Sequence, residues 1–139
     1  MRKEGRLVLL LVEDDHEMRS LLRDELYDLN LGIIEAKDGA EALECASEHV
    51  PDLILTDLRM PAGGLDYLAR LRVIAPSCPI ILMTAFGDAQ THSAALQAGA
   101  TKYFDKPVRM KELRQAIQGL MESHDGPGSP RTPQDGRIQ

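Results

Sequence analysis

Carboxylates, a hydroxyl group and an amine follow the apolar segments of this 139-residue chain. They are the run Glu13-Asp14-Asp15 and the single residues Asp57, Thr84 and Lys106. Several carboxylates in one cleft repel each other, so they must bind a cation or take up protons. Oxygen ligands without histidine or cysteine favour Mg²⁺ over zinc. If the fold brings these residues together, they predict a magnesium site.

The lysine adds a second requirement to this site. Two cations, Lys106 and a metal, are favourable neighbours only if an anion lies between them. A phosphoryl group fits that gap, with the Thr84 hydroxyl as a hydrogen-bond donor. A central carboxylate can then act as a nucleophile toward phosphorus, and phosphoryl transfer requires mainly positioning and charge neutralisation. The residue types alone therefore predict an aspartyl-phosphate site.

Five strand-like segments alternate with five helix-like segments and must position these side chains. Strands are predicted at residues 7–12, 33–36, 53–56, 80–83 and 102–104, and helices at about 18–29, 40–49, 65–74, 88–98 and 110–124. Asn30 and Gly32 are expected to end the first helix. The first strand is apolar throughout, which indicates burial on both faces of a parallel sheet. We predict an α/β, flavodoxin-like (βα)5 doubly wound sheet of order 2-1-3-4-5, with ligands bound beyond the carboxyl ends of its strands.

Four motifs follow one another along this predicted sheet. They are LLLVEDD at residues 9–15 with Arg19 following, DLILTDLRMP at 52–61, ILMTA at 81–85 and GATKYFDKP at 99–107. Each motif is weak alone, but all four in order and at this spacing are specific. Together they resemble the receiver domain of two-component response regulators, and the resemblance covers about residues 6–124.

The resemblance implies a role for each site residue. Asp57 would be the phosphoacceptor. Mg²⁺ would be held by the side chains of Asp14 and Asp57, by the backbone carbonyl of Arg59 and, through a water molecule, by Glu13. The phosphoryl oxygens would contact Thr84, the backbone of Ala85, and Lys106.

The same resemblance implies a switch and a control of phosphate lifetime. Thr84 and Tyr103 would change position on phosphorylation, and the Lys106–Pro107 peptide would be cis. Arg59 and Phe86 would flank the approach of the water that hydrolyses the phosphoryl group. The domain would therefore act as a phosphoacceptor switch with self-phosphorylation and slow autodephosphorylation, rather than as an enzyme.

One loop departs from the family pattern. The segment Ala62-Gly63-Gly64 is one residue shorter than the usual Gly-x-Asp-Gly and has no aspartate, which leaves the path of the loop open.

Three alternative functions fit the residues less well. A haloacid-dehalogenase-like phosphatase would carry a second aspartate where Arg59 stands. A flavin-binding module needs a phosphate loop that Glu13-Asp14-Asp15 would repel. A degenerate receiver that only binds partners is disfavoured by the complete set of acids, threonine and lysine.

Composition limits the other function classes. Hydrophobic residues make up 43% of the chain and charged residues 27%, which is typical of one globular domain. A net charge of -6 and an aromatic content of 4% argue against direct binding of nucleic acid or an anionic membrane. There is no apolar run of the roughly 20 residues that a membrane helix needs. No signal-peptide pattern is found at the N-terminus. The two cysteines, Cys45 and Cys78, are too few for a disulfide framework, and both observations favour a cytoplasmic protein.

The domain organisation follows from a change in composition near the end of the chain. Residues 1–125 are predicted to form the receiver domain. Residues 126–139 are rich in Pro and Gly and are expected to be disordered, as a linker to a missing output domain, a natural tail or a cloning remnant. The implied partner is a sensor histidine kinase or a histidine phosphotransfer protein. A homodimer through the fourth helix, fifth strand and last helix is also expected.

Overall fold

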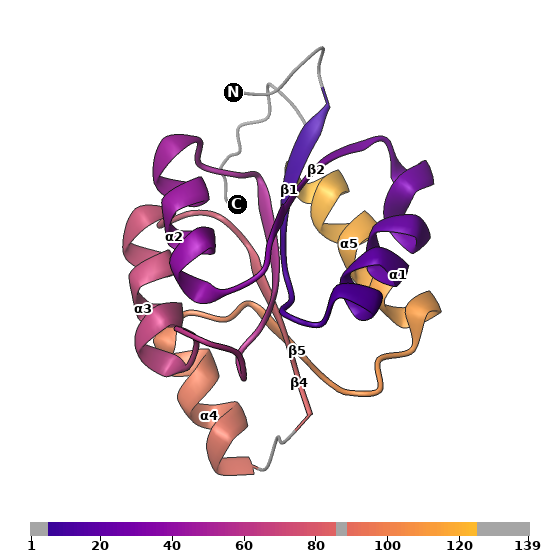
Figure 1. The fold of residues 1–139 in the computed structure, drawn as a ribbon. Helices are drawn as coiled ribbons and strands as arrows, with labels where there is room; N and C mark the ends of the chain where they lie inside the picture. The colour runs from indigo at the N-terminus through magenta and orange to yellow at the C-terminus, as the bar shows by residue number, and fades with distance from the viewer. Residues whose placement is uncertain (1–5, 86–88, 125–139) are drawn as a thin grey trace, which may run out of the picture.

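Five parallel strands form a sheet in the order β2-β1-β3-β4-β5 (Figure 1). The computed structural model describes residues 6–85 and 89–124. The strands are β1 (Leu7–Val12), β2 (Leu31–Ala36), β3 (Leu53–Asp57), β4 (Ile80–Thr84) and β5 (Lys102–Asp105). This order confirms the predicted flavodoxin-like α/β sheet.

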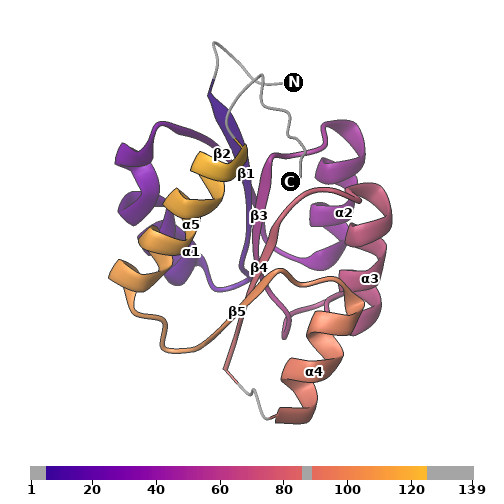
Figure 2. The same cartoon turned by 180° about the vertical axis from the view of Figure 1, so that it is seen from behind.

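Helices cover both faces of the sheet. They are α1 (His16–Leu26) with the short 3₁₀ helix η1 (Tyr27–Leu29), α2 (Gly39–Glu48), α3 (Leu65–Ile74), α4 (Ala89–Ala98) and α5 (Met110–His124). Helices α1 and α5 lie on one face, and α2, α3 and α4 lie on the other, as the front and rear views agree (Figures 1 and 2). Among the residues that the structure describes, no helix is both long enough and apolar enough to span a membrane.

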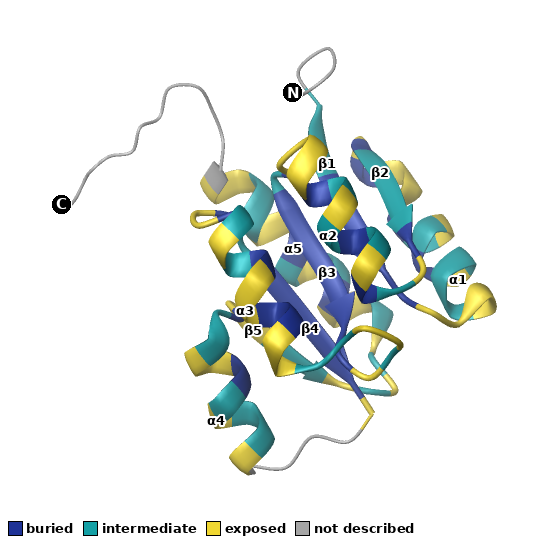
Figure 3. Ribbon diagram, turned by 60° about the vertical axis from the view of Figure 1, so that its left-hand side comes forward, coloured by how far each residue is buried: buried dark blue, intermediate teal, exposed yellow. Residues whose placement is uncertain are grey.

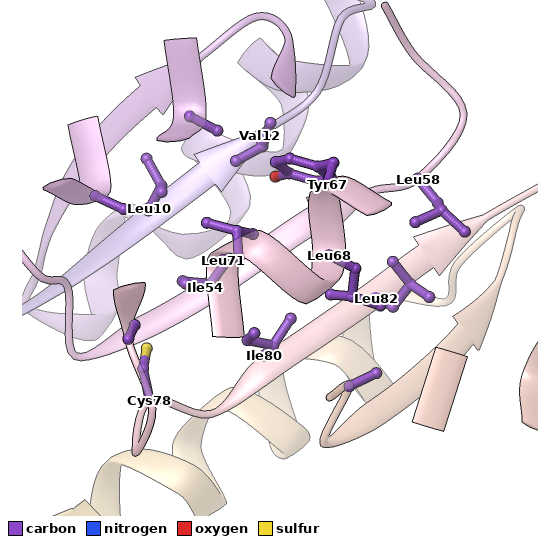
Figure 4. Packing of buried hydrophobic residues seen from close by; sticks show 14 of the residues in the cluster. Leu10, Val12, Ile54, Leu58, Tyr67, Leu68, Leu71, Cys78, Ile80 and Leu82 are labelled. Carbon is purple, nitrogen blue, oxygen red and sulfur yellow. The ribbon is translucent and has the colours of Figure 1, made fainter. Parts of the chain in front are cut away.

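Successive side chains of each strand enter two different cores. In β1, Leu10 and Val12 pack with the residues under α2 and α3 (Figure 4), whereas Leu9 and Leu11 pack with those under α1 and α5. Strands β3 and β4 are buried along their whole length between the two layers (Figure 3). Burial on both faces explains why these strands are continuous apolar runs rather than alternating ones.

Several element boundaries differ from the sequence prediction by one or a few residues. Strand β2 begins at Leu31, and Gly32 pairs with Val8 inside the ladder. The expectation that Gly32 helps to end the first helix was wrong; Asn30, with a left-handed φ of 61°, follows η1 at that boundary. Strands β3 and β4 each continue one residue further than predicted, so that they end at Asp57 and Thr84. Residues 126–139, predicted to be disordered, lie outside the described residues.

Candidate functional site

The carboxyl ends of four strands meet at one edge of the sheet and carry the predicted site. Asp57 and Thr84 are the last residues of β3 and β4, Glu13 follows β1 and Lys106 follows β5. Because β1 and β3 are neighbours in a 2-1-3-4-5 sheet, their ends flank the point where strand order reverses. One ligand oxygen from each of Glu13, Asp14 and Asp57 lies within 4.8 Å of the others.

The turn after β1 is held by hydrogen bonds that leave Asp14 exposed. Asp15 is the N-cap of α1, and its Oδ1 accepts from the backbone N–H groups of Glu17 and Met18 at 3.0 and 3.3 Å. Capping carboxylates satisfy the donors at a helix start. Glu13 is buried, and its Oε2 accepts from the Asp15 N–H at 3.1 Å. Of the three acids, Asp15 therefore caps α1, while Glu13 and Asp14 lie close to Asp57 at the edge of the sheet.

Asp57 is a buried carboxylate with both oxygens engaged. Its Oδ1 accepts from the backbone N–H groups of Leu58 and Arg59 at 2.6 and 3.1 Å. Its Oδ2 accepts from Lys106 Nζ at 2.7 Å. The side chain is only 6% exposed, so its orientation is set by the protein rather than by solvent.

Lys106 bridges two carboxylates that lie far apart in the sequence. Its Nζ is 2.7 Å from Asp57 Oδ2 and 2.7 Å from Glu13 Oε1. Burial by itself would lower the pKa of Lys106, but the hydrogen bonds and charges of Asp57 and Glu13 outweigh it and raise the pKa. The ammonium group therefore stays charged at neutral pH. The Lys106–Pro107 peptide bond that follows is cis.

One lysine does not balance three carboxylates, and this is the observation that tests the site for a metal. Burial raises the pKa of Glu13, against the lowering effect of Lys106, and the charge of Asp57 raises it further. Glu13, Asp14 and Asp57 supply hard oxygen donors, without the sulfur or imidazole that would favour zinc. The donor set fits a divalent cation of the Mg²⁺ type.

Thr84 presents a buried polar atom toward this edge. Its Oγ1 is buried and has no hydrogen-bond partner among the described residues. A buried hydroxyl without a partner is energetically costly. A ligand oxygen that accepted a hydrogen bond from Thr84 would remove this cost. Tyr103, on the adjacent strand β5, packs its ring on that of His92 in α4, with centroids 3.7 Å apart. His92 Nε2 also lies 3.3 Å from Asp105 Oδ1.

The short loop between β3 and α3 is built around left-handed residues. Ala62 has φ 59° and Gly64 has φ 95°. The Pro61 carbonyl accepts from the Gly39 N–H at 3.0 Å, and a Cβ at Gly39 would come within 1.8 Å of the Ala62 carbonyl oxygen. The loop thus reaches α2 through a close backbone contact that only glycine at position 39 permits.

The structure places the remaining predicted residues at the rim of the site. Arg59 and Ala85 are exposed beside the ends of β3 and β4. Phe86 lies outside the described residues. The structure therefore brings Glu13, Asp14, Asp57 and Lys106 together at one edge of the sheet, with Thr84 at the end of the neighbouring strand β4.

A pair of buried hydroxyl groups under Asp57 was missed by the sequence reasoning. Thr56 Oγ1 lies 2.7 Å from the Asp57 carbonyl oxygen and 2.8 Å from Tyr67 OH. A carbonyl can only accept, so Thr56 donates to Asp57 and Tyr67 donates to Thr56. The available signal was a threonine inside an apolar strand, which needs a partner if buried.

The chain belongs to the response regulator receiver domain family, which matches residues 9–118. The acidic group of Glu13, Asp14 and Asp57 is typical of the metal site of such domains. As a receiver domain, the matched region is a phosphoacceptor switch rather than a catalytic enzyme. A receiver domain implies a histidine kinase or phosphotransferase as its partner.

Relatives of this chain include both long regulators and a short one. PilR, a response regulator of Pseudomonas aeruginosa, is 33% identical over 130 residues, which are 93% of this chain and 29% of PilR. The chain spans 55% of the Mycobacterium response regulator MprA, at 33% identity over 126 residues. Sporulation initiation phosphotransferase F of Bacillus subtilis is 31% identical over 111 residues, which are 79% of this chain and 90% of that protein.

Solved structures show the same fold. The N-terminal domain of an uncharacterized Wolinella succinogenes protein is 29% identical, with a TM-score of 0.76, and the match covers 84% of this chain and 94% of that one. A receiver domain protein from Methanospirillum hungatei has a TM-score of 0.82 over 86% of this chain and 97% of its own. At 21% identity the latter supports the fold alone.

Proposed function

We propose that Asp57 accepts a phosphoryl group from a phosphohistidine of a sensor histidine kinase or a histidine phosphotransfer protein. The observation that carries this proposal is the position of Asp57, buried at a strand end between a lysine and two further acids. In the transfer, a carboxylate oxygen of Asp57 forms a bond to phosphorus. The phosphorus–nitrogen bond breaks, and its electron pair leaves with the imidazole.

The proposed cofactor is Mg²⁺. Its ligands would be the Asp14 and Asp57 carboxylates and the Arg59 backbone carbonyl, with Glu13 acting through a water molecule. When bound, the ion neutralises charge that builds up on the phosphoryl oxygens and on the acids. The excess of carboxylates over lysine at this edge supports the assignment.

Three further groups are proposed to hold the phosphoryl oxygens. Lys106 contacts Asp57 at 2.7 Å and is already placed to pair with an anion carried by it. The buried Thr84 hydroxyl lacks a partner among the described residues and would donate to a second oxygen. The backbone N–H of Ala85 would donate to another. Thr84 would exchange an unpartnered buried hydroxyl for a charge-assisted hydrogen bond.

The output is proposed to be conformational. Movement of Thr84 toward the phosphoryl group would free space for Tyr103 to turn inward and would change the surface of α4, β5 and α5. We propose that this surface then forms a homodimer. Sedimentation with and without beryllofluoride tests the dimer: a larger species is expected with it, and an unchanged monomer would refute the dimer.

Arg59 and Phe86 are proposed to slow hydrolysis of the phosphorylated state. Arg59 is long and cationic, and Phe86 has no group that orients a water molecule. The double variant Arg59→Asn/Phe86→Tyr is expected to lose phosphate ~10-fold faster, equivalent to about 1.4 kcal/mol in barrier. Decay of phosphorylated protein after donor removal measures this, and equal or slower decay would show that these side chains do not gate the water.

The setting of the domain is part of the same proposal. Residues 1–125 would form the receiver domain, and residues 126–139 would be a tail or a linker to an output domain. We place the protein in the cytoplasm, where a reducing environment keeps thiols such as Cys45 and Cys78 free.

Phosphorylation by acetyl phosphate with Mg²⁺ tests the acceptor. The intact mass is expected to rise by one phosphoryl group, and Asp57→Asn should abolish the increase. Asp52→Asn is the matched control, because Asp52 precedes the same strand β3 at its opposite end and its Oδ2 accepts from the Val8 N–H at 2.8 Å. A phosphoryl group on a serine, threonine or histidine, or equal loss in both variants, would refute the assignment.

A further inference from the structure

Arg19, in the first turn of α1, ties the turn after β1 to strand β2. One guanidinium nitrogen, Nη1, donates to the Glu13 backbone carbonyl at 2.7 Å. Another, Nε, donates to Glu35 Oε1 in β2 at 3.1 Å. The Arg19 side chain is only 16% exposed. The proposed function leaves this residue without a role, although it belongs to the first motif of the sequence.

Both backbone polar groups of Glu13 are anchored to β2. The Glu13 N–H donates to the Ala36 carbonyl at 3.1 Å. The Glu13 carbonyl is held by Arg19, which is braced by Glu35, the residue before Ala36. Asp14 follows directly and has an exposed side chain. The direction in which the two acids project is therefore set by a backbone that β2 holds from two sides.

Glu35 provides an internal comparison for this arrangement. Its second oxygen, Oε2, accepts from Arg23 Nη1 at 3.1 Å. Arg19 and Arg23 therefore share one carboxylate, but Arg19 is the one that also donates to the Glu13 carbonyl among the described residues. Since Arg19 is paired with Glu35, the pair adds little net charge to the acids, and its main contribution is orientation.

We propose that Arg19, braced by Glu35, is a positioning residue for the metal-binding turn that carries Glu13 and Asp14. The inference rests on the proposed Mg²⁺ site. Partners that orient metal ligands from behind typically change metal affinity by about 10–100-fold when replaced. Lysine keeps the charge of arginine but cannot reproduce its planar fork of donors. Arg19→Lys is therefore expected to weaken Mg²⁺ binding by ~10-fold.

Calorimetric titration of the full chain with Mg²⁺ measures this effect without any phosphorylation. Arg23→Lys is the matched control and is expected to stay within about 2-fold of the parent, as for a partly exposed ion pair. The double variant Arg19→Gln/Glu35→Gln removes both charges of this pair together, and Arg23, which also loses Glu35, keeps its ion pair with Asp24. It is also expected to bind Mg²⁺ ~10-fold more weakly. Urea unfolding without Mg²⁺ records the stability of every variant, because a purely structural role would lower stability but leave the affinity of the folded protein unchanged.

The outcomes separate this inference from the proposed function. If the parent binds Mg²⁺ and Asp14→Asn abolishes binding, the metal site stands. Unchanged affinity in the folded Arg19 variants, or an equal loss in Arg23→Lys, would then overturn the positioning role alone. A parent protein that binds no Mg²⁺, or an Asp14→Asn variant that binds as tightly, would overturn the metal site and the inference together.

Discussion

Replacing Lys106 with methionine removes the ammonium group that bridges two buried acids. The side chains of Glu13 and Asp57 are 1% and 6% exposed, and each lies 2.7 Å from Lys106 Nζ. With all groups ionised, three carboxylates and one ammonium give a local charge of -2, and the variant makes this charge more negative, at -3. Removing one partner of a buried ion pair costs about 3–5 kcal/mol. Because the Lys106 side chain is 18% exposed, we expect the lower end, about 3 kcal/mol.

Urea unfolding at low ionic strength, followed by far-UV circular dichroism with a chelator present, measures this loss. Urea is chosen because guanidinium would screen the charges. Mg²⁺ is expected to reduce the difference between variant and parent, since a divalent cation replaces the missing charge. The second variant Asp57→Asn/Lys106→Met returns the local charge to -2 and should recover much of the loss. Lys102→Met, at an exposed lysine of β5, should change stability by less than about 0.5 kcal/mol.

The stability loss of Lys106→Met should also change with pH, in a direction that the structure predicts. Lys106 lowers the pKa of Glu13, which burial raises above 4.5, so the variant should raise that pKa further. A carboxyl whose folded pKa is raised contributes stability below its unfolded pKa and loses it as pH rises through the folded value. The penalty for Lys106→Met should therefore shrink as pH falls toward 4.5. Stability within about 0.5 kcal/mol of the parent at neutral pH in chelator would refute the reasoning.

Three further predictions concern contacts elsewhere in the fold. Gly39→Ala should destabilise the protein by about 1–3 kcal/mol, because the new Cβ would lie 1.8 Å from the Ala62 carbonyl oxygen; urea unfolding within error of the parent would exclude that clash. Arg72→Ala should lower the free energy of unfolding by about 2–3 kcal/mol, because the Arg72 guanidinium donates to four backbone carbonyls. The control Arg70→Ala removes an exposed ion pair and should lower it by less than about 1 kcal/mol in the same assay. Equal losses of stability in the two variants would contradict the argument. Burial raises the pKa of the Cys78 thiol from 9.0 to about 12, so the unfolded chain ionises first and stability should fall as pH rises from 9.0 to about 12. Cys78→Ala should have a flatter profile over this interval, by up to about 4 kcal/mol at 1.36 kcal/mol per pKa unit, and parallel profiles would rule out the thiol as the cause.

Much of the fold was predictable because its signals are local. The predicted bounds of β1, α3 and α5 match the structure, since uninterrupted apolar runs and helical spacing arise within one segment. The start of β2 was less clear, because Gly32 suggests a helix stop when its segment is considered alone. Its place in the strand depends on pairing with Val8, which lies 24 positions earlier. Strand pairing is a relation between segments, so periodicity within either one does not reveal it.

The sequence by itself determined which residue types end the strands and, through the sheet order, that Glu13, Asp57 and Lys106 share one edge. Only the tertiary structure decided how they meet: Lys106 reaches both acids across 93 and 49 positions. The tertiary structure also decided that Arg19 donates hydrogen bonds both to the Glu13 carbonyl and to the Glu35 carboxylate. The physical reason is that these contacts depend on strand register, on helix placement and on side-chain directions within about one ångström. Those quantities result from the packing of the whole domain, and no single segment encodes them.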